Sequence, residues 1–130
     1  MNPAKTLIVL SVVMIMGIAC SSKLSEAEYY KMATEAFNKE DYETSIKNFE
    51  YIIKYYPEGE RASEALFMLG YINANNTMDL KKAEKYYKEF IEKYPDDELT
   101  DDAQYELKNL GKSVDELPIF QDTPEDSVSN

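Results

Sequence analysis

Between residues 25 and 110, apolar side chains recur at spacings of three and four residues, which is the period of an α-helix with one buried face. The first two stripes consist of Tyr29, Met32, Ala33 and Ala36, and of Ile46, Phe49, Ile52 and Ile53. Short polar breaks interrupt the pattern at residues 39–41, 57–61, 75–79 and 95–100. The pattern therefore predicts five amphipathic helices in an all-α fold.

Several of these segments open with good helix caps. Ser25, followed three residues later by Glu28, forms a capping box in which each side chain accepts a bond from the other residue's backbone N–H. Asp41, Asp79 and Thr100 are expected to cap the second, fourth and fifth helices. The caps and the polar breaks thus agree on where the helices begin.

A pair of helices is repeated along the chain. The segment Ser45-x3-Phe49-x2-Ile52-x4-Pro57 recurs 38 residues later as Ala83-x3-Tyr87-x2-Phe90-x4-Pro95. Upstream of each copy, Tyr29-x2-Met32-Ala33 corresponds to Leu66-x2-Leu69-Gly70. We expect Ala33 and Gly70 to be small because the two helices of a pair cross closely there.

This order of large, small, aromatic and Pro positions resembles the tetratricopeptide repeat, whose usual period is about 34 residues. The sequence departs from that pattern in its longer spacer and in lacking Trp at the large position. The spacer is similar to that of BamD-type outer-membrane lipoproteins and Tol-Pal-associated periplasmic tetratricopeptide proteins. The resemblance implies a short solenoid of two tetratricopeptide-like helical hairpins and a capping helix over residues 25–111. Two unrelated hairpins in an ordinary bundle are the alternative.

The amino-terminal segment has the layout of a secretory signal. Lys5 precedes an apolar run over residues 7–18, and small residues stand just before Cys20. The run is too short for a membrane-spanning helix, which needs roughly 20 residues. The position of Cys20 resembles a lipobox, in which the Cys thiol receives a diacylglyceryl group, although Gly17 stands where Leu is usual. Cleavage before Cys20 and a lipid anchor are implied; an ordinary signal that leaves a free thiol is the alternative.

We therefore divide the chain into a signal peptide (1–19), a lipidated linker (20–24), the tetratricopeptide-like domain (25–111) and an acidic tail (112–130) expected to be disordered. Ser21 after the Cys resembles the state sorted to the outer membrane. In a Gram-negative host, this implies a lipid-anchored protein that faces the periplasm. The apolar pair Ile119 and Phe120 interrupts the polar tail, and whether it docks onto the helices is open.

Composition and charge narrow the function. Acidic residues outnumber basic ones 25 to 14, which gives a net charge of −11. Lys5 is the one charged side chain in residues 1–19, so cleavage of the signal peptide would make the chain still more acidic. This charge repels nucleic acid and anionic membrane surfaces. With no His and one Cys, common metal sites and Ser-His or Cys-His nucleophiles cannot be assembled. The acidic clusters at 96–102 and 122–126 lack calcium-loop spacing and are expected to be solvated. We expect no metal, no cofactor and no catalysis; a hydrolase with paired carboxylates is the enzyme alternative.

In tetratricopeptide arrays the first helix of each pair lines a concave face, and the resemblance places eight residues there. They form an aromatic row, Tyr30, Phe67 and Tyr105; a second row, Thr34, Tyr71 and Asn109; and Asn38 and Asn75 at helix ends. Aromatic groups with polar tips suit protein recognition. Alternatively, Tyr30 and Phe67 pack the junction between repeats.

The interpretation that joins these features is a membrane-anchored scaffold or adaptor at the bacterial cell envelope. Its groove would bind other envelope proteins or peptides, and its setting would be outer-membrane or envelope assembly. Two alternatives stay open. One is a structural repeat protein that self-associates through its ends, and the other is a secreted adaptor without a lipid.

Overall fold

The computed structural model describes residues 23–113 and residue 116. Within them the chain forms five α-helices: α1 (Glu26–Asn38), α2 (Tyr42–Tyr55), α3 (Ala62–Asn75), α4 (Leu80–Lys93) and α5 (Thr100–Asn109). None of these helices is long and apolar enough to cross a membrane. The signal segment, Cys20 and the pair Ile119 and Phe120 lie outside the described residues.

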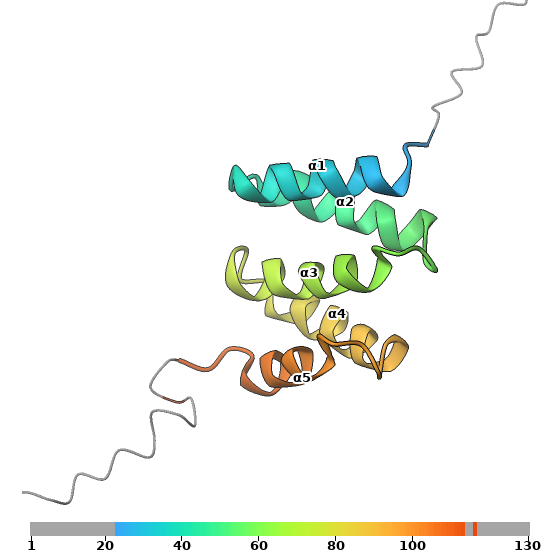
Figure 1. Ribbon diagram of the computed structural model, residues 1–130. Coiled ribbons are helices and arrows are strands. Elements are labelled where there is room, and N and C mark those ends of the chain that lie inside the picture. The colour runs from blue at the N-terminus through green and yellow to red at the C-terminus, as the bar shows by residue number, and fades with distance from the viewer. Residues whose placement is uncertain (1–22, 114–115, 117–130) are drawn as a thin grey trace, which may run out of the picture.

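The helices stack in chain order, from α1 at the top of Figure 1 to α5 at the bottom. The pairs α1–α2 and α3–α4 are antiparallel hairpins, and α2–α3 and α4–α5 contacts join them. Side chains also join helices that are two apart in the chain. Phe37 of α1 packs on Tyr71 of α3, and the Tyr86 hydroxyl of α4 donates to Glu50 of α2. The odd and even helices thus form two layers, and the predicted all-α solenoid of two hairpins and a fifth helix is confirmed.

Three of the four predicted caps are present. Ser25 and Glu28 form the reciprocal capping box, and the side chains of Asp41 and Asp79 accept bonds from Thr44 N and Lys82 N. Each bond satisfies one backbone donor that the first helical turn leaves unpaired.

The prediction that Thr100 caps the fifth helix is wrong. Leu99 occupies the N-cap position of α5, and its side chain makes no capping bond. The Thr100 hydroxyl instead donates to the Tyr94 carbonyl at 2.7 Å. This bond supplies a donor to a backbone carbonyl at the end of α4 and joins α5 to the preceding hairpin.

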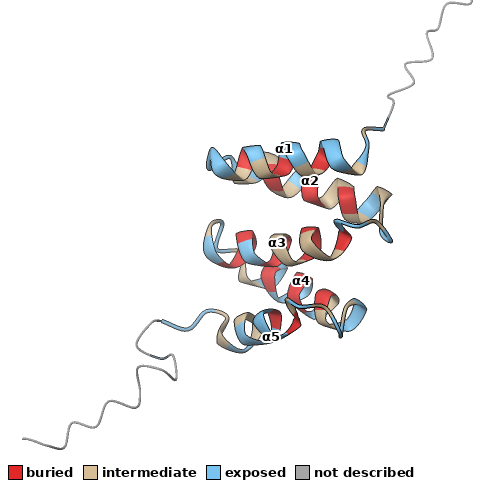
Figure 2. Ribbon diagram, in the orientation of Figure 1, coloured by how far each residue is buried: buried red, intermediate tan, exposed pale blue. Residues whose placement is uncertain are grey.

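The core lies between the two layers, as the buried positions in red show in Figure 2. Its largest fully buried side chains are Tyr87, Phe49, Phe90, Ile52, Leu66, Leu69 and Ile72. Both predicted stripes contribute to this core, but Met32 is 44% exposed, against expectation. The reason is that α1 packs against α2 and also faces α3. Its buried arc is therefore turned toward Tyr30 and Phe37 and away from Met32.

The turns repeat as closely as the helices. Glu40 and Met78, which are 38 residues apart, both have a left-handed backbone, with φ of 60° and 57°, and each directly precedes a capping Asp. The longer connections also match: Gly59 N bonds Tyr56 O at 2.9 Å, and Asp97 N bonds Tyr94 O at 3.2 Å. A duplicated unit, and not a chance pair of hairpins, accounts for this agreement.

The two helices of the second hairpin cross at Gly70. A Cβ placed on this residue would lie 2.7 Å from both Cδ1 and Cε1 of Tyr87. The Tyr87 ring is itself fully buried and packs edge-on against Phe67 at 5.8 Å, so it has no room to withdraw. This confirms the expected close approach at Gly70.

We predict that Gly70→Ala lowers the free energy of unfolding by about 1–3 kcal/mol, because the added methyl group overpacks the crossing. The loss should appear even though alanine favours a helix over glycine by about 1 kcal/mol. Urea unfolding followed by circular dichroism measures it. Repeating the substitution in a Tyr87→Leu background is the control. An equal loss there would mean that the ring contact is not the cause.

Candidate functional site

Tyr30 connects the two hairpins. Its hydroxyl donates to Glu64 of α3, its ring lies 4.6 Å from the Arg61 guanidinium carbon, and it packs edge-on against Phe49 at 6.2 Å. Arg61 in turn bonds Glu64 at 3.2 Å. The hydrogen bond to Glu64 raises the pKa of Tyr30, because it and the adjacent charge favour the protonated phenol. Tyr30 is therefore engaged in the packing between repeats.

Phe67 is engaged as well, although within its own hairpin. Its ring meets those of Tyr87 and Phe90 at 5.8 Å each, both edge-on. It is partly buried against the core. The first two members of the predicted aromatic row are thus largely occupied by contacts inside the molecule.

Tyr71 and Tyr105 differ from these two. Tyr71 on α3 is 37% exposed and Tyr105 on α5 is 46% exposed. Tyr71 has one ring neighbour, Phe37, at 6.5 Å. These two tyrosines present apolar area to solvent on the layer of odd-numbered helices, where the sequence placed a groove.

The predicted polar positions mostly bond to their own helices. Asn75 and Asn109 donate their side-chain N–H groups to the carbonyls of Tyr71 and Tyr105, at 3.0 and 2.8 Å. The Thr34 hydroxyl likewise donates within α1, while Asn38 is exposed at the end of α1. The amides of Asn75 and Asn109 therefore each keep one N–H donor, and the Asn75 oxygen has no hydrogen-bond partner among the described residues, whereas the Asn109 oxygen accepts from the Lys112 ammonium at 3.2 Å.

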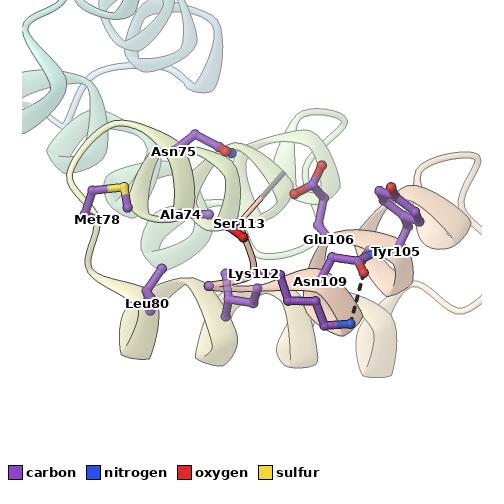
Figure 3. Close-up of a pocket in the computed structure, with 11 residues that line it drawn as sticks. Ala74, Asn75, Met78, Leu80, Tyr105, Glu106, Asn109, Lys112 and Ser113 are labelled. Carbon is purple, nitrogen blue, oxygen red and sulfur yellow. Dashed lines mark hydrogen bonds between the residues drawn. The ribbon is translucent and has the colours of Figure 1, made fainter. Parts of the chain in front are cut away.

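Three of the eight predicted residues meet at one pocket of about 580 Å³. Asn75 reaches it from the end of α3, and Tyr105 and Asn109 reach it from α5 (Figure 3). Its remaining lining residues are Ala74, Met78, Leu80, Glu106, Leu110, Gly111, Lys112 and Ser113. The pocket thus lies where α5 meets the turn between α3 and α4.

The segment after α5 forms one wall of this pocket. Gly111 has φ of +78°, a left-handed conformation that glycine adopts without steric cost. A Cβ on Gly111 would also approach Leu80 to 3.1 Å. The chain reverses here and brings residues 112 and 113 over the pocket, which the helical periodicity could not indicate.

Glu106 is the acidic residue of the lining, and it was not among the residues predicted for the site. Figure 3 shows it projecting from α5 toward α3. Burial raises its pKa, and the neighbouring carboxylate of Asp102 adds to the effect. Among the described residues it has no hydrogen-bond or ion-pair partner, so the pocket contains an uncompensated, partly desolvated carboxylate.

Nothing in the described part gathers three or more His, Cys, Asp or Glu side chains around a possible metal position. Within the acidic segment 96–102, Asp97 accepts the N–H of Leu99 at 3.0 Å and so shapes the turn into α5. Its role there is local to the backbone.

A comparison with protein-family models matches residues 22–122 to the YfiO family, described as outer membrane lipoprotein. The chain belongs to this family. Membership fits the helical repeat and places the protein at the outer membrane, on the periplasmic side of the cell envelope. Comparisons with curated proteins and with solved structures gave no match. Because the family match begins two residues after Cys20, the lipid attachment site itself stays a prediction.

Proposed function

We propose that this outer membrane lipoprotein is a non-catalytic adaptor, tethered through a lipid on Cys20, that holds another envelope protein against its odd-numbered helices. The observation that carries the proposal is the exposure of Tyr71 and Tyr105 on one layer, beside a pocket of about 580 Å³. Tyrosine supplies contact area with little conformational entropy to lose, and it is enriched in protein interfaces. Tyr30 and Phe67 are excluded from the proposed interface because packing engages them.

The start of the domain supports a short tether. Lys23 donates to the Tyr55 carbonyl at 3.3 Å and lies over the Tyr56 ring at 4.3 Å. The Tyr56 hydroxyl donates to the carbonyl of Leu24 at 2.7 Å. Since an extended chain covers about 3.5 Å per residue, Lys23 lies within about 10 Å of Cys20. A lipid on Cys20 would therefore hold the α1–α2 end close to the membrane and leave the pocketed end directed into the periplasm.

Cys20 attachment is tested by the intact mass of the protein isolated from membranes. The wild-type chain should begin at Cys20 and carry the added mass of acyl chains, whereas Cys20→Ala should lack that mass and leave the membrane fraction. Multiple acyl chains give stable anchoring where one chain is marginal. A wild-type chain found unmodified and soluble would contradict the tether and would favour a secreted adaptor.

Partner binding is tested by photocrosslinking in intact cells from a benzoylphenylalanine placed at Tyr71 or Tyr105. Both positions should yield the same discrete adduct with one envelope protein. Exposed Lys47 of α2 and Lys81 of α4 are the matched control positions on the other layer and should not yield it. Equal adducts from both layers, or none from Tyr71 and Tyr105, would contradict the proposal. An adduct with twice the mass of this chain would support self-association instead.

A further inference from the structure

The polar side chains of the pocket are unequally available. Asn75 and Asn109 each donate one of their two side-chain N–H groups to a backbone carbonyl of their own helix. The Ser113 hydroxyl donates to Glu116 at 3.2 Å, and the Lys112 ammonium donates to the Asn109 side-chain oxygen at 3.2 Å. Besides one N–H on each amide, the groups that stay free are acceptors: the Glu106 carboxylate, the Asn75 oxygen and one lone pair on Asn109.

The charge of the pocket points the same way. Lys112 is the one basic residue among the lining side chains, and its ammonium is not within ion-pair distance of Glu106. Glu106 thus holds a partly buried carboxylate with no counter-charge from the described residues. A desolvated charge without a partner is costly unless something supplies the opposite charge. The unpaired carboxylate of Glu106 therefore favours a cationic ligand.

The other lining residues favour a ligand whose cationic group is carried on an apolar chain. Ala74, Met78, Leu80 and Leu110 provide apolar walls, which suit a methylene chain better than a compact hydrated ion. Met78 has a left-handed backbone, which is uncommon for a residue other than glycine. Its side chain is 67% exposed. It therefore offers unburied apolar area at the pocket rim.

Resting on the proposed adaptor function, we infer that the pocket receives a basic side chain, lysine or arginine, from the partner protein. Its charged end pairs with Glu106 and the amide oxygens, and its stem packs against Met78, Leu80 and Leu110. Charge-assisted hydrogen bonds of this kind are about twice as strong as neutral ones. The net charge of −11 makes a basic segment of a partner a favourable occupant over longer distances as well.

The charged form of Glu106 does not stabilise the fold. Burial raises the pKa of this carboxyl, so the folded state binds the proton more tightly than the unfolded state. Stability is then gained as the pH falls through the folded-state pKa and is lowered at neutral pH, where the group is charged. Glu106→Gln should therefore fold at least as stably as the wild type, and a loss of binding in this variant cannot be ascribed to unfolding.

The test uses the full chain purified from membranes and N-acetyl-lysine methylamide as the probe, followed by NMR. The side-chain amide resonances of Asn75 and Asn109 should move and saturate at millimolar probe concentrations. N-acetyl-norleucine methylamide has the same stem without the ammonium and should bind roughly tenfold more weakly. Glu106→Gln should weaken lysine binding by a similar factor.

Two further variants fix the interpretation. Lys112→Gln removes the competing cation and should strengthen lysine binding by about two- to threefold. Glu92→Gln removes an exposed carboxylate of α4 outside the pocket and should change nothing. The inference is overturned if neither resonance moves, if the norleucine probe binds as well as the lysine probe, or if Glu106→Gln has no effect.

Failure of this inference can be separated from failure of the adaptor function. Crosslinking from Tyr105 in the Glu106→Gln background distinguishes them. If Glu106→Gln leaves the adduct undiminished and no lysine binding is found, the adaptor function is supported, and the proposal that the pocket binds a basic side chain is wrong. If lysine binds in the pocket but no adduct forms in cells, the pocket's preference for a basic group is supported and the adaptor function is contradicted.

Discussion

The packing of the second hairpin depends on one close contact, the approach of the Gly70 backbone to the Tyr87 ring. Because residue 70 has no side chain, α3 and α4 come close enough for Tyr87 to be fully buried. That ring then supports Phe67 on the same hairpin. The burial carries a cost, since the Tyr87 hydroxyl finds no hydrogen-bond partner among the described residues and burial raises its pKa. Ring packing outweighs this cost, because each buried aromatic ring removes a large apolar area from water.

Equivalent positions on the odd-numbered helices make different contacts. At the junction between hairpins, Tyr30 reaches across to Glu64 and Arg61, and a carboxylate oxygen of Glu26 accepts the Arg61 N–H at 2.8 Å. At the far end of the solenoid none of the residues that the structure describes forms a further hairpin over α5, and Tyr105, the counterpart of Tyr30, is exposed. The aromatic row is thus packed between helices at Tyr30 and exposed to solvent at Tyr105.

Most of the fold could be predicted from the sequence because the signals are local. A cap such as Asp41 needs only the next few residues, and a helical stripe needs only its own period. The close approach at Gly70 could be predicted too, since it followed from the alignment of the two repeats. Thr100 could not be assigned correctly, because its hydroxyl responds to the Tyr94 carbonyl six residues away, across the turn between α4 and α5.

The site could be predicted only in part. Asn75, Tyr105 and Asn109 were placed on the correct layer by their repeat positions, yet nothing local indicated that they meet at a pocket. That pocket requires the reversal at Gly111 and brings Glu106 of α5 near Ala74 of α3. Such contacts join segments more than 30 positions apart, so they depend on how the hairpins stack. The packing of Tyr30, in contrast, was among the alternatives that the sequence left open.

The central claim is that Tyr30 stabilises the fold whereas Tyr105 binds the partner. Comparing Tyr30→Ala with Tyr105→Ala tests it most directly. Urea unfolding of both variants should be measured beside crosslinking from position 71 in cells. Tyr30→Ala should lower the free energy of unfolding by about 2 kcal/mol, whereas Tyr105→Ala should change it by no more than about 0.5 kcal/mol and yet lose most of the partner adduct. Equal losses of stability in the two variants, or an undiminished adduct in Tyr105→Ala, would contradict the account.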